Sequence, residues 1–141
     1  LAAACDLRLA AEDARFSSPE VDLGIPLAWG GIPRLVREIG PALTKELVIT
    51  CRKFGADEAL SSGFLNRKVD PDTIDDAALD LAEQVAAKPA LPVFATKRHT
   101  NAVTANMVGM NRSWSDADSL IGGLLDAECS AAREAYIKSR L

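Results

Sequence analysis

The 141-residue sequence lacks the residue patterns of several common catalytic and cofactor sites. It contains one histidine, His99, on a predicted helix unrelated to any candidate nucleophile. A Ser/His/Asp nucleophile set is therefore not indicated. No P-loop, GxGxxG segment or zinc-type spacing occurs, so neither nucleotide hydrolysis nor a metal site is indicated. We therefore expect His99 to be a surface residue of its helix.

Cysteine is scarce. Cys5, Cys51 and Cys129 are odd in number and show neither metal nor redox spacing. This pattern favours buried free thiols in a reducing compartment, and we expect a cytoplasmic protein.

Basic clusters and long apolar runs are missing too. The net charge is −4 and no basic block occurs, which argues against nucleic acid as a partner. The longest uncharged run is short and broken by proline and glycine, so we expect no membrane span. Hydrophobic residues make up 48% of the chain, which is enough for a folded core.

The stretch of greatest chemical interest is residues 5–31, because it places Glu20 after a proline and before a run with little charge. A carboxylate held against apolar surface has its ionised form disfavoured, and such a group can exchange protons near neutral pH. On local sequence alone, a solvated loop glutamate is the more ordinary interpretation.

Two long motifs change that interpretation. The first follows A-x-x-C-D-[LI]-R-[IL]-A-x-x-x-A-x-F-x-x-P-E-x-x-[LI]-G, then an apolar loop and G-G-x-x-R-L. Its matches are Ala2, Cys5, Asp6, Leu7, Arg8, Ala10, Ala14, Phe16, Pro19, Glu20, Leu23, Gly24, Gly30, Gly31, Arg34 and Leu35. The second, ELVITCRKFGADEALSSGFLNRKV, is similar to E-L-x-L-T-G-R-x-x-x-A-x-E-A-x-x-x-G-L-V-N-x-V-V. Together they resemble the crotonase (enoyl-CoA hydratase/isomerase) superfamily over about the first hundred residues.

The resemblance implies an α/β protein with the crotonase-like (ClpP/crotonase) spiral fold. Residues 1–70 would form the C-terminal part of the spiral core, and residues 71–141 a helical region for trimer contacts. Because LAAACD matches the inside of a family helix, we expect the chain to be the C-terminal part of a longer protein. The family's oxyanion donors would then lie upstream of Leu1, and the isolated piece should be inactive.

The implied reaction is hydration of a 2-enoyl-CoA to a 3-hydroxyacyl-CoA, with Glu20 as the acid/base. An isomerase or another thioester-enolate reaction is the alternative within the family, and a truncated non-catalytic subunit is the alternative outside it. The coenzyme A thioester is the substrate, no cofactor is expected, and the partner would be further copies in a homotrimer or hexamer.

Further site residues follow from the same resemblance. The apolar loop would wall the acyl pocket and bind substrate through Leu27, Ala28, Trp29 and Gly30, although plain core packing also fits it. Lys97 and Tyr136 are the expected CoA-binding residues. The family's E-G pair is absent near the end of the chain, where DAECSAAREAYIKSR stands instead.

Hydrophobic periodicity and turn residues predict the order of elements. Strands are expected at 6–10, 14–16 and 64–69. Helices are expected at 31–39, 41–50, 56–60, 73–87, 93–107, 120–125 and 128–139.

Overall fold

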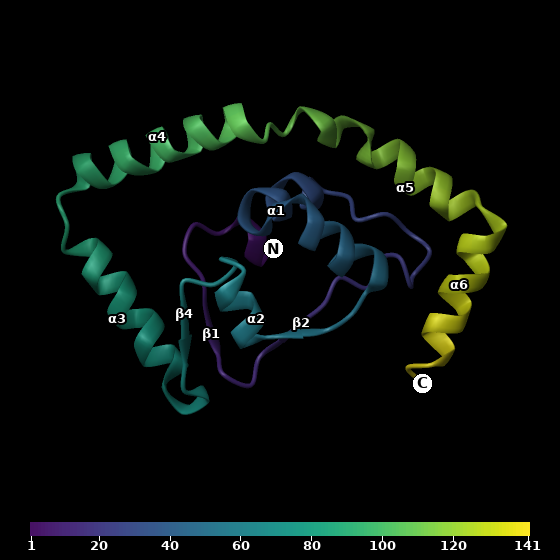
Figure 1. The fold of residues 1–141 in the computed structure, drawn as a ribbon, viewed down its shortest axis with the longest axis horizontal. Coiled ribbons are helices and arrows are strands. Elements are labelled where there is room, and N and C mark those ends of the chain that lie inside the picture. The colour runs from purple at the N-terminus through teal and green to yellow at the C-terminus, as the bar shows by residue number, and fades with distance from the viewer. The chain divides into compact units, whose positions relative to one another are not determined.

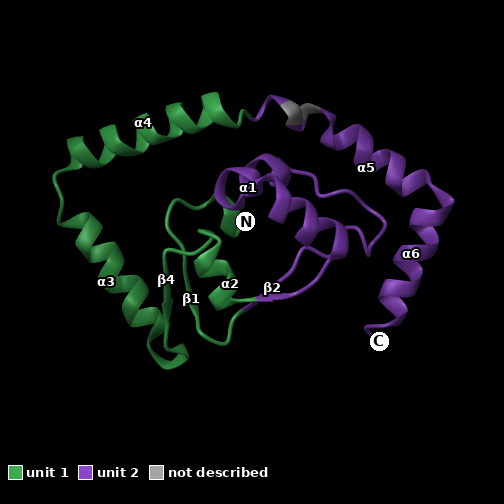
Figure 2. Ribbon diagram, viewed as in Figure 1, with its two compact units in different colours: residues 1–14, 55–109 green, residues 15–54, 110–141 purple. Residues whose placement is uncertain are grey.

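The computed structural model describes residues 1–141, except for the side chains of Arg112 and Trp114. The chain forms two compact units, and each is assembled from two separate stretches (Figure 2). Unit 1 comprises residues 1–14 and 55–109, and unit 2 comprises residues 15–54 and 110–141. Figure 1 labels the elements along the chain.

Unit 1 is built on a parallel pair of short strands. Strand β1 (Leu9–Ala11) pairs with β4 (Arg67–Val69), with Leu9 opposite Arg67. Helix α2 contacts β4 and helix α3 contacts β1. The helical elements of this unit are η1 (Ala2–Ala4), α2 (Ala56–Ser61), η2 (Pro71–Thr73), α3 (Ile74–Ala86) and α4 (Ala90–Met107).

A buried arginine ties the two strands of unit 1 to their flanking loops. The Nε of Arg8 donates to the Phe64 carbonyl at 2.5 Å, and its Nη1 donates to the Cys5 carbonyl at 2.5 Å. The guanidinium carbon lies 5.0 Å from the centroid of the Phe64 ring. The Arg8 N–H also donates to Asn66 Oδ1 at 2.7 Å. These contacts offset the cost of removing a charged side chain from water.

Unit 2 contains the long helix α1 (Gly31–Thr50), which changes direction at Gly40. Gly40 has φ 75° and ψ 167°, a backbone conformation that glycine adopts readily and other residues rarely do. Pro41 begins the second half of the helix. The helix buries Pro33, Thr44, Leu47 and Val48. The other elements are β2 (Arg15–Phe16), β3 (Phe54–Gly55), η3 (Asn111–Ser115), α5 (Asp116–Leu125) and α6 (Ala127–Lys138).

Two side-chain contacts close unit 2 locally. Phe16 of β2 stacks on Phe54 of β3 with ring centroids 5.3 Å apart, and both residues are half-buried. Asp126 caps α6 by accepting a hydrogen bond from the Cys129 N–H at 2.9 Å, and that bond lowers the pKa of the Asp126 carboxyl.

The expected helices are found, including the break between residues 39 and 41. The strands are shorter than expected. Residues 6–8 precede β1 because the Arg8 N–H bonds to the Asn66 side chain and not to a neighbouring strand. Strand β3 is a pairing that the sequence analysis missed. The cysteines are free, but Cys5 is exposed and Cys51 and Cys129 are only half-buried, so the expectation of three buried thiols was wrong.

Two features are absent from the described residues. No described helix has the length and apolar character needed to cross a membrane. No cluster of three or more His, Cys, Asp or Glu among the described residues could hold a metal ion.

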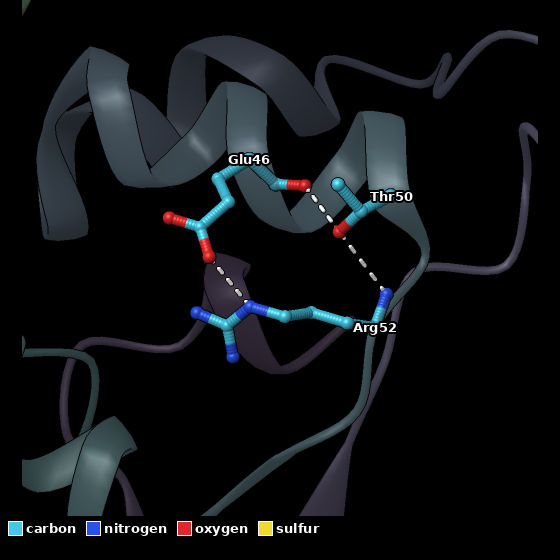
Figure 3. Close-up of polar contacts among 3 residues, drawn as sticks. All are labelled: Glu46, Thr50 and Arg52. Atoms are coloured by element: carbon cyan, nitrogen blue, oxygen red, sulfur yellow. Dashed lines mark hydrogen bonds and ion pairs between the residues drawn. The ribbon is translucent and has the colours of Figure 1, made fainter.

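The end of α1 is closed by three polar side chains from the second motif (Figure 3). Arg52 Nε pairs with Glu46 Oε1 at 2.6 Å. The Thr50 hydroxyl donates to the Glu46 carbonyl at 2.7 Å and accepts from the Arg52 N–H at 3.4 Å. Between them, Cys51 has the left-handed φ of 51°, at the position where the family pattern has glycine. The Glu, Thr and Arg of the pattern E-x-x-x-T-x-R therefore make the contacts at which α1 ends.

We predict that Cys51→Gly raises stability by about 0.5–1 kcal/mol, because glycine adopts this conformation without the steric cost that Cβ imposes. Cys51→Val should lower stability by at least about 1 kcal/mol, since a β-branched residue fits left-handed backbone poorly. Urea unfolding measures both. A valine variant as stable as the glycine variant would show that the turn relaxes away from this conformation.

Candidate active site

Glu20 lies at the start of a tight, hydrogen-bonded turn in unit 2. The Leu23 N–H donates to the Pro19 carbonyl at 3.1 Å, and the Ile25 N–H donates to the Glu20 carbonyl at 2.9 Å. The Gly24 N–H donates to the Val21 carbonyl at 2.9 Å. Three internal hydrogen bonds over seven residues fix the backbone on which the Glu20 carboxylate is mounted.

The carboxylate itself is half-buried and oriented by its neighbour. The Ser18 hydroxyl donates to Glu20 Oε2 at 2.6 Å. A carboxylate has two acceptor oxygens, and this hydrogen bond uses one of them. Asp22, two residues on, is exposed. The Glu20 and Asp22 carboxylates thus differ in exposure, because the turn partly shields only Glu20 from solvent.

The turn packs against the junction of α5 and α6 with no space for a side chain at Gly24. A Cβ built on Gly24 would lie 2.1 Å from the Cys129 carbonyl oxygen, and φ there is 67°. From the other side, a Cβ on Gly123 would lie 3.0 Å from the Gly24 carbonyl oxygen. Partial desolvation and the nearby Asp126 raise the pKa of the Cys129 thiol. Glycine at both positions lets the backbones touch.

The apolar loop after the turn supplies the expected pocket residues. Ala28 is buried at 3% exposure, whereas Trp29 is 70% exposed and has a left-handed φ of 56°. Gly30 is buried, and its N–H donates to Asp116 Oδ2 at 2.8 Å. Ala28, Trp29 and Gly30 line one pocket of about 400 Å³ in unit 2. Leu27 instead lies under Gly31, where an added Cβ would approach its side chain to 2.8 Å.

The expected CoA-binding residues belong to different units. Lys97, on α4 of unit 1, pairs with Asp6 at 2.5 Å, and both side chains are 56% exposed. Tyr136, on α6 of unit 2, lies under the Arg140 guanidinium at 5.1 Å from its ring centroid. Both assignments stay predictions. Asp6 is therefore the ion-pair partner of Lys97.

The sequence analysis missed the contribution of η3 and α5 to the site. Ser113 and Asp116 line the same pocket as Trp29 and Gly30, although 86 residues separate Gly30 from Asp116. The family motifs end before this region, and neither residue has a local signal that ties it to the loop.

Comparisons with known proteins identify the family to which this chain is similar. A family model described as enoyl-CoA hydratase/isomerase matches residues 1–121. A short-chain-enoyl-CoA hydratase of Clostridium acetobutylicum is 37% identical over 101 residues, which cover 72% of this chain and 39% of the relative. The human mitochondrial Delta(3,5)-Delta(2,4)-dienoyl-CoA isomerase is 43% identical over 99 residues, which cover 69% of this chain and 30% of the relative.

A solved structure gives the same result for the fold. The enoyl-CoA hydratase/isomerase of Pseudoalteromonas atlantica superposes with a TM-score of 0.87 at 26% identity. The match covers 99% of this chain and 55% of that chain. The chain therefore spans well under two thirds of the length of each of these relatives.

The contact between the Glu20 turn and α5 leads to a prediction about two adjacent glycines. Gly122→Ala should raise stability by about 0.5–1 kcal/mol, because alanine favours helix and open space surrounds this position. Gly123→Ala should be less stable than Gly122→Ala by at least about 1 kcal/mol, because its Cβ meets the Gly24 carbonyl. Chemical unfolding of the two variants measures the difference. Equal stabilities would mean that the turn does not rest tightly on α5.

Proposed function

Because the chain belongs to the enoyl-CoA hydratase/isomerase family, we propose that the protein containing it hydrates a 2-enoyl-CoA to a 3-hydroxyacyl-CoA. The crotonase-type α/β fold is shared with the Pseudoalteromonas structure. The observation that carries the proposal is the hydrogen-bonded turn that mounts Glu20 in the matched family motif.

In the proposed reaction, water adds across the C2=C3 bond of the acyl group. The oxygen of water bonds to C3, and one proton is delivered to C2, so no oxidant or reductant is consumed. Glu20 exchanges a proton during this step, as a positioned carboxylate can do near neutral pH. The Ser18 hydroxyl donates to one carboxylate oxygen, and we assign the proton exchange to the other. The acyl-CoA is the substrate, and we assign no further cofactor.

An isomerase reaction is the second candidate, and the match to the human dienoyl-CoA isomerase favours it. A double-bond shift needs proton removal and return at acyl carbons but no bound water, so Glu20 alone would serve. A non-catalytic subunit is the third candidate. Assays that follow both water addition and double-bond migration separate the three.

We further propose that copies of the protein associate, with a homotrimer as the first choice and a hexamer as the second. Large apolar side chains are exposed along α3 to α6 in both units. They include Leu79, Leu91, Phe94, Val103, Met107, Ile121, Leu124, Leu125 and Ile137. None of these four helices has a fully buried residue among those described. Exposed apolar surface of this extent is typical of an interface.

A cytoplasmic location completes the proposal. The free thiols Cys5, Cys51 and Cys129 support it, since reducing compartments keep cysteines unpaired. Recovery of the protein in a secreted or membrane fraction would contradict it.

Glu20→Gln should lower crotonyl-CoA hydration by at least about 10²-fold, because glutamine keeps the shape but cannot exchange the proton. The assay uses the protein that contains this chain, with binding of a saturated acyl-CoA measured alongside. Binding should be unchanged.

Asp22→Asn is the matched control, since it removes an exposed carboxylate from the same turn. Its activity should stay within about twofold of the unaltered protein, because exposed groups outside the reacting geometry contribute little. Full activity in Glu20→Gln, or an equal loss in both variants, would overturn the assignment of Glu20.

Light scattering after size exclusion tests the proposed association. We expect a mass of three or six copies of the protein, because burying the apolar residues on α3 to α6 is favourable at about 25 cal/mol per Å². Leu125→Asp, which places a charge on an 83% exposed apolar position, should shift the mass downward. A folded monomer before any substitution would contradict the proposal.

A further inference from the structure

The pocket in unit 2 combines apolar walls with polar groups that lack full hydrogen bonding. It occupies about 400 Å³, within the range of small-molecule sites. One wall comes from the start of α1 and the loop before it, with Trp29, Gly30 and Arg34. The other comes from η3 and α5, with Met110, Ser113 and Leu120 among its residues.

Ser113 provides the evidence that the pocket holds a ligand. Its hydroxyl oxygen is buried and has no hydrogen-bond partner within the part of the chain that the structure describes. Burying a hydroxyl without a hydrogen-bond partner costs free energy, so native structures rarely leave a buried hydroxyl unpaired. A group entering this pocket that could both donate to and accept from Ser113 would remove that cost.

Asp116 and Arg34 restrict what that group can be. Asp116 uses Oδ2 to accept the Gly30 N–H, which leaves Oδ1 as a second acceptor. Arg34 is occupied on Nη1, which donates to the Trp29 and Gly30 carbonyls at 3.1 Å each. An anionic ligand would face the Asp116 carboxylate, and a plain alkyl chain would leave Ser113 unpaired. A neutral hydroxyl has both the donor that Asp116 can accept and the acceptor that Ser113 lacks.

We propose that this pocket binds an acyl chain that carries a hydroxyl group, with Ser113 and Asp116 as its specificity-determining residues. The inference rests on the proposed function, because it takes the ligand to be an acyl thioester. Met110, Leu120 and the Trp29 indole contact the apolar part of the chain, and the hydroxyl donates to Asp116 and accepts from Ser113.

The two methionines of the chain provide the measurement. Met110 lines the pocket, whereas Met107 lies on α4 and is 76% exposed. The chain is labelled with ¹³C at its methionine methyl groups and titrated with 5-hydroxypentanoyl- or pentanoyl-N-acetylcysteamine. We expect the hydroxylated thioester to shift the Met110 signal, to leave Met107 unchanged, and to bind about tenfold more tightly than the plain one.

Variants assign the preference to its residues. Ser113→Ala should bring the affinity ratio of the two thioesters close to one without weakening the plain thioester. Asp116→Asn should lower the ratio while its amide oxygen still accepts the Gly30 N–H. Ser119→Ala, an exposed serine on the same helix, should leave the ratio unchanged.

Three outcomes would overturn the inference: equal affinities in the unaltered chain, a preference that survives Ser113→Ala, or no Met110 shift with either thioester. Equal affinities would mean that water satisfies Ser113. If Ser113→Ala fails to fold, the ratio in the unaltered chain still decides. These experiments measure binding without turnover. A negative result would therefore count against the hydroxylated ligand and not against hydration by Glu20, which the Glu20→Gln assay tests.

Discussion

The candidate site depends on direct backbone contact between the Glu20 turn and the α5–α6 junction. A side chain at Gly24 would collide with the Cys129 backbone, and one at Gly123 would press on the Gly24 carbonyl oxygen. The Gly30–Asp116 hydrogen bond holds the same loop a few residues later. Because α5 and α6 bury none of their residues fully, apolar side-chain packing is a weak source of this attachment. Steric fit between glycines and one side-chain-to-backbone hydrogen bond supply it, so the position of Glu20 is set by the last part of the chain.

Unit 1 is held together in a different way, by one charged side chain. Arg8 connects the carbonyls of Cys5 and Phe64 and the Phe64 ring, while its backbone exchanges hydrogen bonds with Asn66. The small residues Ala56 and Ala59 of α2 are exposed by only 1% and 0% and belong to the core of the same unit. The D-L-R segment of the first motif thus has a structural explanation that involves no catalysis.

Much of this arrangement could be predicted from the sequence, because the motifs are long and the helical periodicity is regular. The helix boundaries fell within a few residues, and the family assignment followed from the residues around Pro19–Glu20. Ser113, Asp116 and the Gly24–Gly123 contact could not be predicted, since each joins residues about a hundred positions apart whose local sequence is ordinary. Strand β3 is two residues long, and periodicity cannot detect so short an element. Cys51 replaces a pattern glycine without disturbing the turn, which pattern matching alone does not reveal.

The interleaving of the two units has a consequence for how the chain folds. Each unit joins stretches that are distant in sequence: Arg8 and Asn66 are 58 residues apart, and Gly30 and Asp116 are 86 apart. Neither unit can complete itself from one contiguous stretch, and contacts of such separation form only after large loops have closed. During synthesis on the ribosome, the turn with Glu20 therefore emerges long before the helices against which it packs. Its native geometry is a late event in folding.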